Sequence, residues 1–207
     1  MQIAVLTFEG FNELDSFVAA SILNRLKPKG WKAWITCSAD TVTSMNGVTV
    51  EAQKPLEFAR EADAVIVGSG IMTRAIAQDT ALLDRLQLDP ARQMIGAQCS
   101  GTLLLARLGL LGGRPACTDL TTKPWVIDAG VRVLDQPFHA DGNIATAGGC
   151  LASQYLATWL MLGLGTREDA EAALHYVAPV GQKEEYLLRA IGVVGPFLQP
   201  PAMLAGA

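Results

Sequence analysis

The segment MIGAQCSGTLLLARLGLLGG, residues 94–113, decides how the rest of the sequence is read. It passes from a short apolar run, typical of a strand buried on both faces, through Cys99, Ser100 and Gly101 into a leucine-rich stretch. This order predicts a strand, a tight turn and a helix, with Cys99 in the turn. Ligands of open α/β proteins bind at the carboxyl ends of such strands, so Cys99 is the first candidate functional residue.

Segments with the same features occur along the whole chain. Apolar runs predict buried strands, and apolar residues at helical spacing predict helices between them. We expect strands at 3–8, 32–37, 62–70, 94–98, 115–118, 131–134 and 143–147, and helices at 14–26, 79–88, 120–129, 150–163, 166–177 and 183–194. Asn46-Gly47 predicts a two-residue hairpin turn. This alternation predicts one α/β domain over residues 1–207, with a mostly parallel sheet covered by helices on both faces.

The composition limits the classes of function. Half of the 207 residues are hydrophobic, and the formal net charge is only −4. No stripe of Lys and Arg is present, so we expect no nucleic-acid partner, and no apolar run reaches the roughly 18 residues of a membrane span. The N-terminus resembles a first strand rather than a leader, which predicts a cytoplasmic protein. Its four cysteines are widely spaced, so we expect free thiols and no metal site.

Cys99 has two interpretations. A free cysteine is a small hydrophobe that often only fills space in a core. At the junction of a strand and a helix, however, the helix N-terminus favours a thiolate, and the turn directs the side chain outward. Polar Gln98 and Ser100 on either side favour the second interpretation, a reactive thiol.

Four motifs in the expected order resemble the DJ-1/PfpI superfamily, whose fold is class I glutamine amidotransferase-like. They are IAVLTFEGFNELD (3–15), DAVIVGSG (63–70), CSGTLLLARLGLLGGRPACT (99–118) and DGNIATAGGCLAS (141–153). The resemblance implies a flavodoxin-like three-layer sandwich, a homodimer and no cofactor.

Within that superfamily the pattern is most similar to isocyanide hydratases, because Asp15 follows a leucine in the first loop. The resemblance implies that Cys99 is the nucleophile and Asp15 its acid/base partner. Backbone N–H groups of Gly70 and Ser100 would face an oxyanion-like centre. Ser69, Asp119 and Cys150 are further pocket candidates, and Cys150 is interpreted either as a packed core thiol or as a resolving cysteine.

Two departures from the superfamily pattern bear on the reaction. Asp119 stands where a histidine is common, and Ser100 follows the cysteine where the peptidase-like branch has a histidine. We expect structural roles for His139 and His175, so no Cys–His pair is predicted. The sequence therefore predicts a cofactor-free cysteine hydratase or hydrolase of a small molecule. The alternatives are a non-enzymatic thiol redox sensor and a ligand-sensing domain related to transcription regulators.

Overall fold

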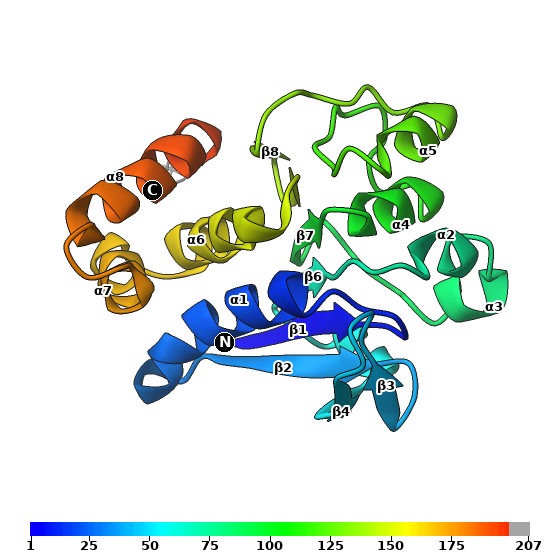
Figure 1. Cartoon of the computed structure of the whole chain (residues 1–207), viewed down its shortest axis with the longest axis horizontal. Helices are drawn as coiled ribbons and strands as arrows, with labels where there is room; N and C mark the ends of the chain where they lie inside the picture. Colours follow the sequence, from blue (N-terminus) through cyan, green and yellow to red (C-terminus); the bar gives the residue numbers. More distant parts are fainter. Residues whose placement is uncertain (199–207) are drawn as a thin grey trace, which may run out of the picture.

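A seven-stranded sheet organises the fold of residues 1–198, the part of the chain that this computed structural model describes. The strand order is β5-β2-β1-β6-β7-β9-β8, and all neighbours are parallel except β8 and β9 (Figure 1). The strands are β1 (Gln2–Thr7), β2 (Lys32–Cys37), β5 (Lys54–Pro55), β6 (Ala64–Val67), β7 (Met94–Gln98), β8 (Phe138–Asp141) and β9 (Ile144–Ala147). A separate hairpin consists of β3 (Thr41–Thr43) and β4 (Thr49–Glu51).

Helices cover both faces of the sheet, as the sequence predicts. One face is covered by α1 (Glu13–Leu23) and α6 (Ser153–Leu164), and α7 (Arg167–Val177) and α8 (Lys183–Val194) pack on these helices. The other packs against the 3-10 helix η2 (Leu56–Arg60) and the short helices α2 (Thr73–Ile76), α3 (Thr80–Leu83), α4 (Gly101–Arg107) and α5 (Lys123–Asp128). Further 3-10 turns are η1 (Asn24–Lys29), η3 (Cys150–Ala152) and η4 (Gly195–Phe197). The result is the expected flavodoxin-like three-layer sandwich.

The first strand shows why a continuous apolar run indicates burial on both faces. Successive side chains of a strand point to opposite sides. Ile3 and Val5 enter the core beneath α1 and α6, whereas Ala4 and Leu6 enter the core beneath α4. All four side chains are fully buried.

The edge of the sheet differs from the prediction. The strands expected at 115–118 and 131–134 reduce to one isolated bridge between Ala116 and Val133. The edge position is taken instead by β8, which pairs antiparallel with β9 and which the sequence analysis missed. This strand contains His139 and Asp141, so it lacks the apolar run that marks the central strands.

Three further predictions need adjustment. The hairpin loop spans residues 44–48 instead of two residues, because the hydroxyl of Ser44 accepts a hydrogen bond from Val48 N–H and fixes a wider turn. The helix expected at 79–88 ends at Leu83 and continues in 3-10-type turns, in which Leu86 N–H donates to Leu83 O. The helix predicted over 14–26 changes from α to 3-10 geometry after Leu23.

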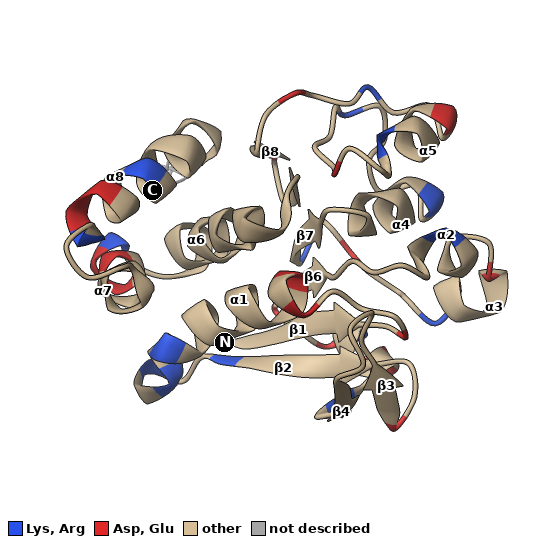
Figure 2. Cartoon of the chain, viewed as in Figure 1, with Lys and Arg blue, Asp and Glu red and all other residues tan. Residues whose placement is uncertain are grey.

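Two features of the described chain concern its helices and its charged residues. No helix within residues 1–198 is long and apolar enough to cross a bilayer. In the view of Figure 2, basic and acidic residues lie scattered over separate helices and loops.

Candidate active site

Cys99 occupies a strained turn between β7 and α4. Its φ of 46° is the only positive value at a non-glycine residue in the described chain. Such a conformation costs on the order of 1–3 kcal/mol and persists only where the surroundings enforce it. Here the backbone N–H of Cys99 donates to Ala147 O at 2.8 Å, and the carbonyl accepts from Thr118 Oγ1 at 2.8 Å. The predicted elbow is therefore present.

Gly101 permits the close approach that makes this turn tight. A Cβ atom at position 101 would lie 2.5 Å from the carbonyl oxygen of Val67 and 2.6 Å from that of Gly68. Only glycine allows α4 to begin this close to the end of β6.

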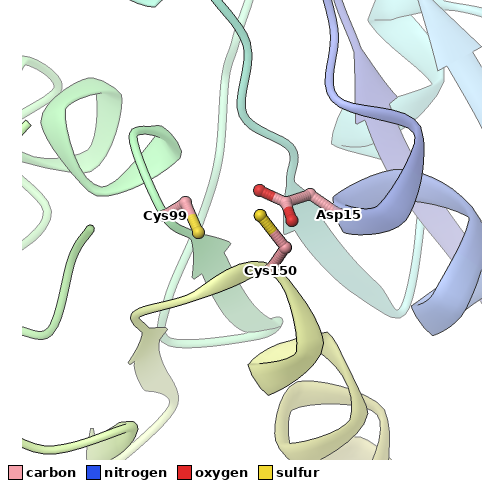
Figure 3. A group of neighbouring side chains, drawn as sticks. All are labelled: Asp15, Cys99 and Cys150. Carbon is pink, nitrogen blue, oxygen red and sulfur yellow. The ribbon is translucent and has the colours of Figure 1, made fainter. Parts of the chain in front are cut away.

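The structure brings Asp15, Cys99 and Cys150 together at the carboxyl edge of the sheet (Figure 3). Asp15 is in the first turn of α1, Cys99 follows β7, and Cys150 begins η3 after β9. Their sulfur atoms and a carboxylate oxygen all lie within 4.8 Å of one another. The expected proximity of Asp15 and Cys99 is confirmed, and Cys150 completes a compact group of donor atoms.

Three polar side chains hold this group in place. Ser69 Oγ donates a short hydrogen bond to Asp15 Oδ2, while Oδ1 of Asp15 is buried and has no hydrogen-bond partner within residues 1–198. Gln98 Nε2 donates to Cys99 Sγ at 3.3 Å, and Asn12 Nδ2 donates to Cys150 Sγ at 3.2 Å. The cluster therefore contains one carboxylate oxygen that is free to exchange a proton with a neighbouring group.

The electrostatics of the cluster differ from the expectation of a thiol with a lowered pKa. Burial raises the pKa of Cys99, and the carboxylate of Asp15 raises it further. Burial also raises the pKa of Asp15, against the lowering effect of the Ser69 hydrogen bond. The cause is desolvation, because Cys99 is only 4% exposed, and it outweighs the effect of a helix of just seven residues. A charged Asp15 therefore opposes ionisation of Cys99, and protonation of Asp15 removes that part of the opposition.

The two expected oxyanion donors differ in availability. Gly70 N–H points at the hydroxyl oxygens of Thr73 and Ser100, at 3.1 and 3.2 Å. A Cβ atom at Gly70 would also lie 2.3 Å from Gly10 O, so close backbone contact alone explains this glycine. By contrast, Ser100 N–H has no acceptor in the described part of the chain. Oxyanion binding by either group stays a prediction.

Asp119 lies beside the cluster but has a structural partner. Its Oδ1 accepts from Thr122 N–H at 2.9 Å, just before α5. It also lines a cavity of about 420 Å³ together with Thr118, Gly148 and Gly149, and its charge contributes to the raised pKa of Asp15. Asp119 therefore acts on the cluster through charge.

Neither histidine is part of this group. His139 is on β8, with its ring 5.2 Å from that of Phe197, and burial lowers its pKa. His175 is exposed on α7 beside Glu184. The sequence analysis used Gln98 as a polar neighbour of Cys99, but it missed Asn12, which is at the N-cap of α1.

A strained turn that presents a cysteine beside a buried carboxyl group, at the carboxyl edge of a parallel sheet, defines an α/β protein with a nucleophile elbow. The sequence profile of the DJ-1/PfpI family matches residues 1–161. The chain therefore belongs to the DJ-1/PfpI family.

Individual relatives agree with this assignment. Isonitrile hydratase from Pseudomonas putida is 26% identical over 184 residues, which cover 85% of this chain and 78% of that protein. Drosophila melanogaster DJ-1beta superposes with a TM-score of 0.75 at 20% identity, covering 85% of this chain and 96% of its own. A ThiJ/PfpI family protein from Pseudomonas syringae gives 0.73 at 23% identity, covering 94% and 90%. These structural similarities establish the fold.

Proposed function

We propose that the protein is a cofactor-free, cysteine-dependent hydratase that converts an isocyanide and water into an N-substituted formamide. The observation that carries the proposal is the buried carboxyl group of Asp15, which has an oxygen within 4.8 Å of the elbow sulfur and whose Oδ1 has no hydrogen-bond partner among the described residues. The similarity to a protein named isonitrile hydratase supports the substrate class.

The cluster offers both the nucleophile and the proton that this reaction needs. A thiolate and a carboxylate this close titrate as a pair, so the reactive state has Asp15 protonated and Cys99 ionised. The sulfur attacks the terminal carbon of the isocyanide, and Asp15 delivers its proton to the same carbon, giving a thioimidate. Asp15, now ionised, takes a proton from water as the hydroxide adds to this carbon, and it passes that proton to the nitrogen of the substrate. The C–S bond then breaks while Asp15 accepts the hydroxyl proton, so the formamide is released with Cys99 ionised and Asp15 protonated.

A groove of about 350 Å³ beside the start of α1 is lined by Leu14, Phe17 and Leu151, and the side chains of the cluster are not part of its lining. Leu14 and Leu151 are exposed. The same apolar surface supports the proposal of a homodimer, which sedimentation equilibrium tests. Localisation in the cytoplasm likewise stays a proposal, tested by cell fractionation.

The proposal is tested by incubating the purified chain with a simple alkyl isocyanide and measuring formamide by chromatography. We expect steady turnover by the wild type and none by Cys99→Ala. Cys37→Ala, which removes another buried thiol, provides the matched control and keeps full activity. An α-oxoaldehyde is the competing substrate, because glyoxalase chemistry has to move protons between adjacent carbons. Turnover of the oxoaldehyde without isocyanide hydration would contradict the proposal.

A redox function is the second candidate, because a second thiol lies next to Cys99. Oxidation of Cys99 by peroxide in a protein that turns over neither substrate would favour this candidate.

A further inference from the structure

Cys150 is not explained by core packing. Cys37, Cys99 and Cys117 are buried, whereas Cys150 is partly exposed, and the next residue, Leu151, is 66% exposed. This partial exposure favours the interpretation of Cys150 as a resolving cysteine over that of a packed core thiol. The sulfur of Cys150 accepts a hydrogen bond from Asn12 Nδ2 at 3.2 Å.

The backbone fixes Cys99 and Cys150 next to each other. Strands β7 and β9 are parallel neighbours with Gln98 opposite Ala147, and each cysteine follows the end of its strand. The hydrogen bond from Cys99 N–H to Ala147 O ties the two strand ends together. Gln98 Nε2 adds a second tie by donating to Gly149 O at 2.8 Å.

The two sulfur atoms lie within reach of a covalent bond. They are no more than 4.8 Å apart, and a disulfide bond is about 2 Å long, so side-chain rotation has to bring them roughly 3 Å closer at most. In Figure 3 both thiols point toward the space between the two turns. Gly148 and Gly149 precede Cys150, and Gly149 has a φ of 90°. The backbone just before this sulfur therefore adopts a conformation that favours glycine.

From this juxtaposition we infer that Cys99 and Cys150 form a reversible intramolecular disulfide when the protein meets a hydroperoxide. One thiolate attacks the terminal oxygen of the hydroperoxide, the O–O bond breaks, and an alcohol leaves with the thiol proton. The resulting sulfenic acid is attacked by the second sulfur, and its hydroxyl group leaves as water with the second thiol proton. Two thiols are thereby oxidised by two electrons, and the hydroperoxide is reduced to alcohol and water.

The disulfide has two consequences for the site. It joins the end of β7 to the start of η3 and occupies the elbow sulfur, so Cys99 cannot act as a nucleophile until a thiol reductant restores it. It also intercepts the sulfenic acid before a second peroxide oxidises it irreversibly to the sulfinic acid. Cys150 thus acts as the resolving cysteine of Cys99.

Mass spectrometry of the intact, reduced chain treated with hydrogen peroxide tests this inference. The wild type should lose the mass of two hydrogen atoms, yield a peptide cross-linked through Cys99 and Cys150, and regain its mass with dithiothreitol. Cys150→Ser should instead gain oxygen atoms on Cys99 that dithiothreitol does not remove. Cys37→Ala, the matched loss of a thiol outside the cluster, should behave as the wild type does.

Two controls keep this result decisive. Circular dichroism melting of Cys150→Ser and Cys150→Ala shows whether the variants fold, and either folded variant serves the comparison. Oxygen gain on Cys99 in the wild type with no cross-linked peptide would overturn the inference, as would an unmodified Cys99. The readout needs no isocyanide turnover, so failure of the proposed hydratase activity leaves the mass result intact, and the reverse also holds.

Discussion

Two buried cysteines in this protein stand at the carboxyl ends of parallel strands, and only one of them has the surroundings of an active site. Cys37 is the last residue of β2, and Cys99 follows the last residue of β7. Burial alone raises the pKa of Cys37 to about 11. Cys99 has in addition a strained backbone, a carboxyl group and a second thiol.

The difference arises from the position of each strand in the sheet and from the loops that follow the neighbouring strands. β2 is near the edge of the sheet, and its outer neighbour β5 has only two residues. β7 is central, so the loops after β1, β6 and β9 converge on its end and bring Asp15, Ser69 and Cys150 to Cys99. A cysteine at a strand end therefore becomes a site only where several loops meet.

The largest expected effect follows from removing the proton donor. Asp15→Asn preserves the shape of the side chain but cannot supply a proton, and general acid–base groups contribute about 10²–10⁴-fold to rate. We therefore expect the rate of formamide production at saturating isocyanide to decrease by a factor of about 10²–10⁴. Unchanged turnover would show that Cys99 acts without this carboxyl group, as an isolated strand-end thiol would.

The next effect is on stability as a function of pH. The pKa of Asp15 is raised in the folded protein, so its contribution to stability is fully present below the ordinary aspartate range. That contribution is lost as the pH rises through the folded-state pKa. Urea unfolding should therefore show Asp15→Asn gaining stability relative to the wild type over that interval, by up to about 1.4 kcal/mol per pH unit. A difference in unfolding free energy between Asp15→Asn and the wild type that stays constant from acid to neutral pH would contradict the raised pKa of Asp15.

Backbone strain gives a smaller effect, of opposite sign at the two cysteines. Glycine relieves a positive φ, so Cys99→Gly should be more stable than Cys99→Ala by about 1 kcal/mol. At position 37, within a strand, glycine should be less stable than alanine by roughly 0.5–1 kcal/mol. Thermal melts of the four variants measure both differences. The same sign at both positions would mean that Cys99 is not strained.

The smallest effect concerns the second acid. The charge of Asp119 raises the pKa of Asp15, so Asp119→Asn should lower that pKa slightly and shift the pH profile of turnover toward acid. The comparison variant is Asp40→Asn, at an exposed position on the side of Cys37, which should leave the profile in place. A shift of the turnover profile toward alkaline pH in Asp119→Asn would contradict the claim that the charge of Asp119 raises the pKa of Asp15.

The sequence predicts the sheet and the elbow because both depend on local patterns. The apolar runs of β1 and β7 require burial on both faces, and Gly101 after Cys99 marks a tight turn. The proximity of Asp15 and Cys99 came from family resemblance, since no spacing along the chain implies contact between residues so far apart.

The remaining features depend on tertiary contacts. The contact between Asn12 and Cys150 depends on the meeting of loops that lie far apart in the sequence, which no short segment encodes. The direction of the Cys99 pKa shift was wrong because desolvation depends on what covers the thiol. The missed strand β8 is held by pairing with β9, without an apolar pattern of its own.

The most direct test of the central claim, that Asp15 and Cys99 form one titrating unit, is the rate of thiol alkylation as a function of pH in the wild type and in Asp15→Asn. Site-resolved mass spectrometry follows Cys99 and Cys37 in the same samples. The carboxylate raises the pKa of Cys99, so its removal should move the Cys99 alkylation profile to lower pH and leave that of Cys37 unchanged. An unmoved Cys99 profile, or an equal shift at both cysteines, would contradict the coupling.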